Sequence, residues 1–119
     1  MKRDWEVVRE LLLALEAKDD VTTNLSFLPG RDQNIVAYQI QILGEAGLIH
    51  GGASIRGLDE RLTAHAFRLT WAGHELLDTM RDNTAWSKIK HKAAEKGVSL
   101  SFQVIGMLAK EYAKAHLGI

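Results

Sequence analysis

Apolar side chains in the first forty-six residues recur at steps of three and four, which predicts two amphipathic helices. The first apolar series is Trp5, Val8, Leu11, Leu12 and Leu15. Asp4 is suited to cap that helix, which we expect to end near Ala17. Asp32 is suited to cap the second helix, which we expect to run to about Ala46. Gly47 then ends it, because glycine readily adopts the left-handed conformation found after a helix.

Between residues 49 and 71 the glycines and an alternation of apolar and polar side chains predict a β-hairpin with a long loop. On the second strand the alternation places Phe67, Leu69 and Trp71 on one face. Residues 25–28 form a short candidate strand that ends at a Pro-Gly turn. The expected sheet is therefore a small hairpin, or a three-stranded sheet if residues 25–28 join it.

The remaining sequence predicts three further helices. Their candidate N-caps are Thr70, Asp82, and either Ser99 or Ser101. The apolar positions at helical spacing are Leu76, Leu77, Met80, Trp86, Ile89, Ala93, Phe102, Ile105, Leu108, Ala109 and Tyr112. Each of the three tryptophans begins an apolar stripe, so we expect all three in the core. The length and composition favour one domain over residues 1–119, with a core at 1–81 and a helical extension at 82–119.

Two motifs are typical of a winged helix-turn-helix. The second helix ends in Glu45-Ala-Gly-Leu-Ile, and Arg68-Leu-Thr-Trp-Ala-Gly-His-Glu has the form of a strand that closes a wing and turns into the next helix. The other motifs are Met1-Lys-Arg-Asp, Arg9-Glu-Leu-Leu-Leu, Val36-Ala-Tyr-Gln-Ile, Arg81-Asp-Asn-Thr-Ala-Trp and Ser99-Leu-Ser-Phe. Together they resemble the bacterial and phage-associated domain-of-unknown-function family numbered 2513. The resemblance spans nearly the whole chain and implies an α+β, winged-helix-like fold with extra C-terminal helices. It carries no established activity.

Charge gives limited support to nucleic-acid binding. The chain has 15 basic and 15 acidic residues, so its net charge is zero, whereas duplex binding depends on neutralising phosphates. Residues 86–119 nevertheless hold six lysines, Lys88, Lys90, Lys92, Lys96, Lys110 and Lys114, against only two acidic residues. Local charge on this part of the chain is compatible with a DNA contact.

If the chain is a DNA-binding regulator of phage or mobile-element type, the second long helix should enter the major groove and the hairpin should form the wing. Amide side chains on that helix, Gln39 among them, are of the type that pairs with adenine, although they also serve as ordinary solvated surface. No Arg or Lys lies between Arg31 and Arg56. The candidate DNA-binding residues are Gln33, Asn34, Ala37, Tyr38, Gln41, Arg56, Arg61 and Arg68.

The alternative is a protein-interaction module that kept the scaffold without DNA binding. Ile35, Tyr38 and Ile42 form a second apolar stripe on the same helix, beside the stripe that should face the core. We expect the C-terminal helices to bury this second stripe; the other interpretation is a partner surface. Homodimerisation fits either function, because the last helix also has a broad apolar face.

The remaining chemistry argues for neither a metal site nor an enzyme. Five histidines are present, but none forms a His-x-x-x-His pair, and the chain has no cysteine. Neither a P-loop, a dinucleotide fingerprint nor a Gly-x-Ser-x-Gly motif occurs. We therefore expect no enzymatic activity, no cofactor and no metal. Because no apolar run is long enough for a signal peptide or a membrane span, we expect a cytoplasmic protein without a membrane association.

Overall fold

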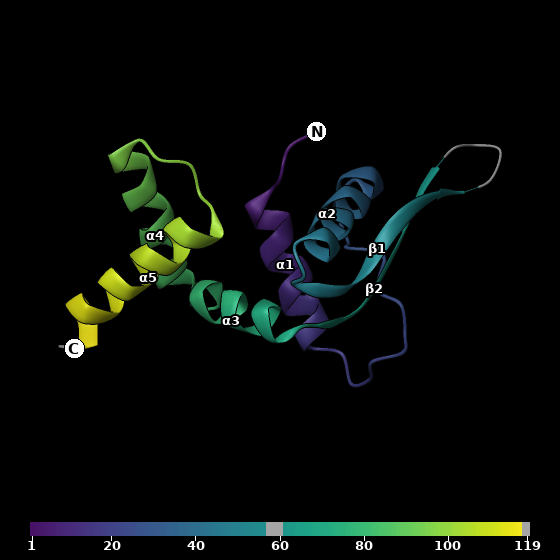
Figure 1. Cartoon of the computed structure of the whole chain (residues 1–119), viewed down its shortest axis with the longest axis horizontal. Helices are drawn as coiled ribbons and strands as arrows, with labels where there is room; N and C mark the ends of the chain where they lie inside the picture. Colours follow the sequence, from purple (N-terminus) through teal and green to yellow (C-terminus); the bar gives the residue numbers. More distant parts are fainter. Residues whose placement is uncertain (57–60, 118–119) are drawn as a thin grey trace. The chain divides into compact units, whose positions relative to one another are not determined.

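The computed structural model describes residues 1–56 and 61–117, without the side chains of Arg56, Arg61 and Leu117. Within these ranges the chain forms five helices and one hairpin (Figure 1). The elements are α1 (Trp5–Glu16), α2 (Gln33–Glu45), β1 (Ile49–Arg56), β2 (Arg61–Leu69), α3 (Trp71–Met80), α4 (Asn83–Lys96) and α5 (Phe102–Leu117). The chain is thus mainly helical with a small antiparallel sheet, which confirms the expected α+β class.

The chain divides into two compact units, Met1–His74 and Glu75–Ile119. The first contains α1, α2 and the hairpin, and the second contains α4 and α5. Each unit is described by itself below. The expected organisation as one domain stays a prediction.

The helix starts of the first unit form as the sequence predicts. The carboxylate of Asp4 accepts hydrogen bonds from the backbone N–H groups of Glu6 and Val7 at the start of α1. Asp32 does the same for α2. These carboxylates satisfy N–H groups that have no partner within the helix and lie favourably at the positive end of the helix dipole. After α2, Gly47 takes a positive φ of 74°.

The core of the first unit lies among α1, α2 and the hairpin, since each helix buries one face. Its apolar members are Val7, Val8, Leu11, Leu12, Leu15, Leu28, Val36, Ala37, Ile40, Leu43, Leu48, Ile49, Ala64, Ala66 and Leu69. Trp5 is only half-buried, and the Arg3 guanidinium lies 4.7 Å above its ring. The prediction that Trp5 is a core residue is therefore correct only in part.

A β-bulge changes the alternation predicted for β2. His50 pairs with Arg68 but Gly51 pairs with Ala66, so Phe67 has no opposite residue on β1. The bulge shifts the buried face by one position: Ala66 is buried before it and Leu69 after it, while Phe67 is half-buried. The prediction of one face shared by Phe67, Leu69 and Trp71 was wrong. Trp71 instead begins α3 and is 80% exposed, so it is not a core residue.

Residues 17–32 connect α1 and α2 through turns and bends, without a helix. The predicted strand at residues 25–28 is reduced to one bridge, in which Leu25 and Ala66 exchange backbone hydrogen bonds of 2.8 and 3.1 Å. The described sheet is therefore two-stranded. A helix-turn-helix requires a separate helix shortly before its recognition helix, and this connection supplies none. The winged-helix assignment stays a prediction.

Local signals also position the helices that follow the hairpin. The Thr70 hydroxyl accepts a 3.1 Å hydrogen bond from Gly73 N–H in the first turn of α3. Asp82 caps α4, and Ser101, not Ser99, caps α5 through a 3.2 Å bond from Val104 N–H. In the second unit α4 and α5 pack together. Their buried side chains are Trp86, Ile89, Ala93, Ile105 and Leu108, as the spacing predicts.

Candidate binding surface

The outward face of α2 combines one tyrosine with apolar and amide side chains. Asn34 and Ile35 are exposed, and Tyr38 and Ile42 are half-buried. The helical period places Tyr38 near the middle of this face, with Ile35 and Ile42 one turn to either side. This stripe is therefore not part of the core of the first unit, and its expected burial by the C-terminal helices stays a prediction. We call Asn34, Ile35, Tyr38 and Ile42 the outer face of α2.

A hollow of about 430 Å³ lies between the start of α2 and β2. Its lining is Asn24, Ser26, Gln33, Asn34, Ala37, Leu62, Thr63 and Ala64. The structure thus brings Gln33 and Asn34, two of the predicted site residues, beside polar groups of β2 and the preceding loop. All of the lining side chains are uncharged. The polar side chains among them can donate and accept hydrogen bonds, but none of the lining side chains can neutralise phosphate.

Ala37 lies at the base of this hollow and is only 3% exposed. Because α2 contacts both β1 and β2, its buried arc is wide and includes Ala37 as well as Val36 and Ile40. Ala37 is therefore a core residue of the first unit, a position that does not favour its predicted contact with DNA.

The side chain of Gln41 is hydrogen-bonded to the hairpin. Its Oε1 accepts a 2.6 Å hydrogen bond from Ala53 N–H of β1, and its Nε2 donates a 3.1 Å bond to Glu45. The amide therefore covers part of the outer edge of β1, where an unpaired N–H would otherwise be exposed. Reading a base would require Gln41 to give up these bonds, so the structure argues against its predicted role.

Gln39 is completely buried. Its Oε1 accepts a 2.9 Å hydrogen bond from Asp4 N–H, and its Nε2 donates a 3.0 Å bond to the Lys2 carbonyl. The side chain therefore fastens the N-terminal segment to α2 and is unavailable to a base edge. A signal existed in the sequence, because Gln39 lies three residues after Val36 and beside Ile40, on the side of the helix predicted to face the core.

Basic side chains near this surface differ in availability. Arg68 is exposed on β2, as expected for a wing residue. Arg56 and Arg61 occupy the ends of the strands, but their side chains lie outside the described residues. Arg31 forms a bidentate pair with Glu10, with N···O distances of 2.5 and 3.2 Å, and this hydrogen bonding raises the pKa of Arg31. The Arg31 cation is therefore engaged within the chain.

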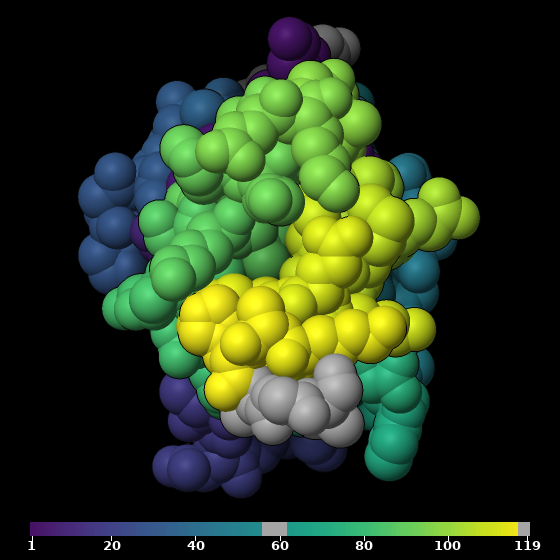
Figure 2. All heavy atoms as spheres, turned by 90° about the vertical axis from the view of Figure 1, so that its left-hand side faces the viewer, coloured from purple at the N-terminus to yellow at the C-terminus, as the bar shows by residue number. Residues whose placement is uncertain are grey.

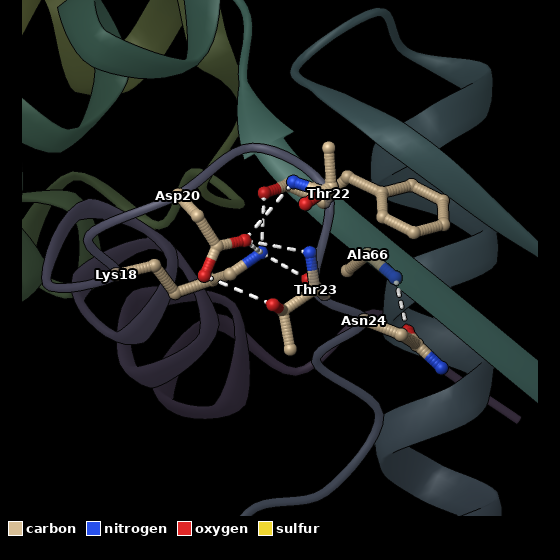
Figure 3. Close-up of polar contacts among 7 residues, drawn as sticks. Lys18, Asp20, Thr22, Thr23, Asn24 and Ala66 are labelled. Atoms are coloured by element: carbon tan, nitrogen blue, oxygen red, sulfur yellow. Dashed lines mark hydrogen bonds and ion pairs between the residues drawn. The ribbon is translucent and has the colours of Figure 1, made fainter.

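Lys18 is a second cation whose hydrogen bonds are made within the chain. Its ammonium donates hydrogen bonds to the backbone carbonyls of Thr23 and of Phe67 on β2, the latter at 2.7 Å, and it lies 4.0 Å from Asp20 (Figure 3). Beside it, Asn24 accepts a 3.0 Å bond from Ala66 N–H. These contacts fix the loop after α1 along the open edge of β2, so that both edges of the short sheet are partly covered.

Asp20 organises the same loop. Its carboxylate accepts hydrogen bonds from Thr22 N–H at 3.0 Å, Thr23 N–H at 2.6 Å and the Thr23 hydroxyl at 2.9 Å. The bond from Thr23 N–H is the main cause that lowers the pKa of Asp20 below 3.8. Since the folded pKa lies below the unfolded one, the contribution of Asp20 to stability is complete above about pH 4 and falls as acid protonates the folded carboxylate.

None of the described helices combines the length and hydrophobicity that a bilayer span requires. Within the ranges that the structure describes, no group of three or more His, Cys, Asp and Glu side chains is arranged to hold a metal ion.

Residues 2–99 match the family described as a hypothetical protein (DUF2513). An uncharacterized protein of Haemophilus influenzae strain Rd is 37% identical over 114 residues, which cover 92% of this chain and 93% of that protein. No solved structure matches the chain. The family match runs from α1 through α4 and ends before α5. As its motifs predict, the chain belongs to the DUF2513 family.

Proposed function

We propose that this protein is a non-enzymatic interaction module that pairs with a second copy of itself through the outer face of α2. The observation that carries the proposal is the composition of that helix, which contains no Lys or Arg and presents Tyr38 between Ile35 and Ile42. Tyrosine is enriched among the residues that dominate protein interfaces, and interface centres are depleted of charge. Duplex DNA would instead favour cations at these positions.

The outer face of α2 is suited to pairing with a copy of itself. In an isologous dimer the same patch is used twice, about a two-fold axis. If two α2 helices lie antiparallel with the axis near Tyr38, Ile35 of one copy faces Ile42 of the other.

Tyr38→Asp tests this proposal, because it places a charge at the centre of the proposed interface. Hot-spot residues, which are enriched in tyrosine and cluster near interface centres, each contribute about 2 kcal/mol or more, so we expect the dimer dissociation constant to rise at least about thirtyfold. Sedimentation equilibrium over a concentration series measures it. Ile55→Asp is the matched control, since Ile55 is exposed on β1, away from α2, and should leave dimerisation unchanged. A wild-type chain that is monomeric at every concentration would contradict the proposal, as would an undiminished Tyr38→Asp dimer.

DNA-binding regulation is the second candidate, supported by the exposure of Arg68 on β2 and of Lys88, Lys92 and Lys96 along α4. Under this alternative, the protein should raise the anisotropy of a labelled mixed-sequence duplex at about 50 mM salt and lose much of that affinity at about 200 mM. Arg56→Glu combined with Arg68→Glu should abolish the binding and leave the helical circular dichroism unchanged. If the double substitution did not weaken binding, Arg56 and Arg68 would not contribute to DNA contact. If the natural chain did not bind at low salt, dimerisation would be the better supported function.

A further inference from the structure

A second surface lies in the unit Glu75–Ile119, where α4 and α5 form a groove of about 270 Å³. Figure 2 looks onto this face, which is hollowed between the green of α4 and the yellow of α5. Ile89 and Leu108 are each 2% exposed and form its apolar floor. The volume is close to the lower limit of about 300 Å³ for small-molecule pockets, so the groove offers room for an apolar side chain rather than a large ligand.

The rim of the groove is basic on the α4 side. Lys88 and Lys92 line it one turn apart, and both side chains are exposed. Glu111 lies on the α5 side, but it is 3.8 Å from the Lys96 ammonium, so its charge is partly compensated. The groove therefore combines an apolar floor with cations beside it.

Aromatic contacts fix the α5 wall. The rings of Tyr112 and His116 stack with centroids 4.0 Å apart, and a His116 ring nitrogen lies 2.9 Å from the Tyr112 carbonyl oxygen. The Lys88 ammonium lies 5.9 Å from the centroid of the Tyr112 ring. Because His116 already occupies one face of Tyr112, this ring is a packed wall of the groove and a poor platform for stacking a nucleobase.

We propose that the α4–α5 groove binds an acidic amphipathic segment of a partner protein, with an apolar side chain on Ile89 and Leu108 and carboxylates at Lys88 and Lys92. Charge complementarity and the apolar floor are both needed for this assignment. The phosphates of a duplex would satisfy the lysines but leave the floor unfilled. An amphipathic helix satisfies both, since its apolar stripe and the acidic residues beside that stripe would lie along the same groove.

The groove is independent of the proposed dimer, because its lining residues all belong to the second unit and none lies on α2. Five of its eight lining residues come from α5, beyond the residues matched by the family. The groove proposal can therefore fail while dimerisation through Tyr38 holds, and the reverse is equally true.

The probe is a fluorescein-labelled helical peptide built of Leu, Ala and Glu, with one leucine stripe flanked by glutamates, titrated into the full chain at physiological salt. We expect Lys88→Glu with Lys92→Glu to weaken binding at least about tenfold, because the rim then repels the peptide. Lys110→Glu with Lys114→Glu makes the same change of net charge at exposed positions of α5 that do not line the groove. Screening over about 8 Å should keep its effect below about threefold.

Ala115→Trp is a charge-neutral second test, since Ala115 is exposed and lines the groove, and a large ring there should block the floor. It should also weaken binding about tenfold, and circular dichroism should show that all variants retain their helices. Equal weakening by the two double substitutions, equal binding of a peptide with Lys in place of Glu, or full binding by Ala115→Trp would each overturn the proposal. So would absence of peptide binding together with tight binding of a single-stranded oligonucleotide, because nucleic acid would then be the ligand.

Discussion

Gly73→Ala is expected to lower the free energy of unfolding by about 3 kcal/mol, at the upper end of the usual range for overpacking. A Cβ atom at Gly73 would lie 2.0 Å from the Leu48 carbonyl oxygen and 3.1 Å from its carbon. Both contacts are with backbone, which cannot turn aside as a flexible side chain can. Leu48 is also fixed at this point, because its carbonyl accepts a 3.0 Å hydrogen bond from Thr70 N–H. Chemical denaturation followed by circular dichroism measures the loss.

The matched control for Gly73→Ala is Gly106→Ala. Gly106 also lies within a helix, in α5, but a Cβ there would meet nothing within 4 Å. Alanine favours a helix over glycine by roughly 0.8–1 kcal/mol, so this variant should be slightly more stable than the natural chain. If the two substitutions changed stability by similar amounts, the close approach of α3 to Leu48 would not be what requires glycine at position 73.

Gly73 also illustrates what the sequence cannot predict. Gly47 was assigned correctly as the residue that ends α2, because a helix stop is a local signal. The requirement at Gly73 arises from Leu48, which is distant in the chain, and nothing in the residues around position 73 indicates that contact. The Asp4, Asp32 and Asp82 caps were predicted for the same reason as Gly47, since each acts within its own first turn.

The hairpin shows the same difference between features set by local sequence and features set by distant residues. The alternation along residues 64–71 predicted a strand correctly, and β2 covers Arg61–Leu69. It placed Phe67 and Leu69 on one face because it assumed regular pairing. The extra residue at Phe67 is a property of how β2 pairs with β1, so its effect on burial could not be read from β2 alone.

In the candidate site, too, the sequence predicted what depends on helical spacing and missed what depends on contacts with distant residues. Helical spacing separated the core face of α2 from an outer stripe, and it identified Ile35, Tyr38 and Ile42 as the unusual feature. It treated the glutamines of α2 alike, as solvated surface or base readers. Gln41 instead bonds to Ala53 and Gln39 to Asp4 and Lys2. The position of Gln39 on the core side of the helix indicates that it is buried, but the partners of both amides come from other segments, so only the three-dimensional structure identifies those partners.

Gln39→Met is the second substitution for which we expect a large effect, again about 3 kcal/mol of lost stability. Methionine has nearly the size and flexibility of glutamine, so the change removes the amide with little change of volume. It leaves Asp4 N–H and the Lys2 carbonyl without their partner, and both hydrogen bonds are partly buried. A fully buried group left unsatisfied costs about 1–3 kcal/mol, so we expect the two partly buried groups together to account for the loss. The N-terminal segment should then detach from α2 more often, and the first turn of α1 should lose protection.

Chemical denaturation measures the loss of stability in Gln39→Met, and amide hydrogen exchange locates it. We expect faster exchange at Asp4 and in the first turn of α1, with little change in α4 and α5, because local opening is set by the contacts of the segment itself. Gln103→Met is the control, since Gln103 is exposed on α5 and should tolerate the same replacement. Slow exchange at Asp4 in Gln39→Met, with stability equal to that of the control, would show that the buried amide does not hold the N-terminal segment. The hydrogen bonds to Asp4 and Lys2 would then contribute nothing measurable to the fold.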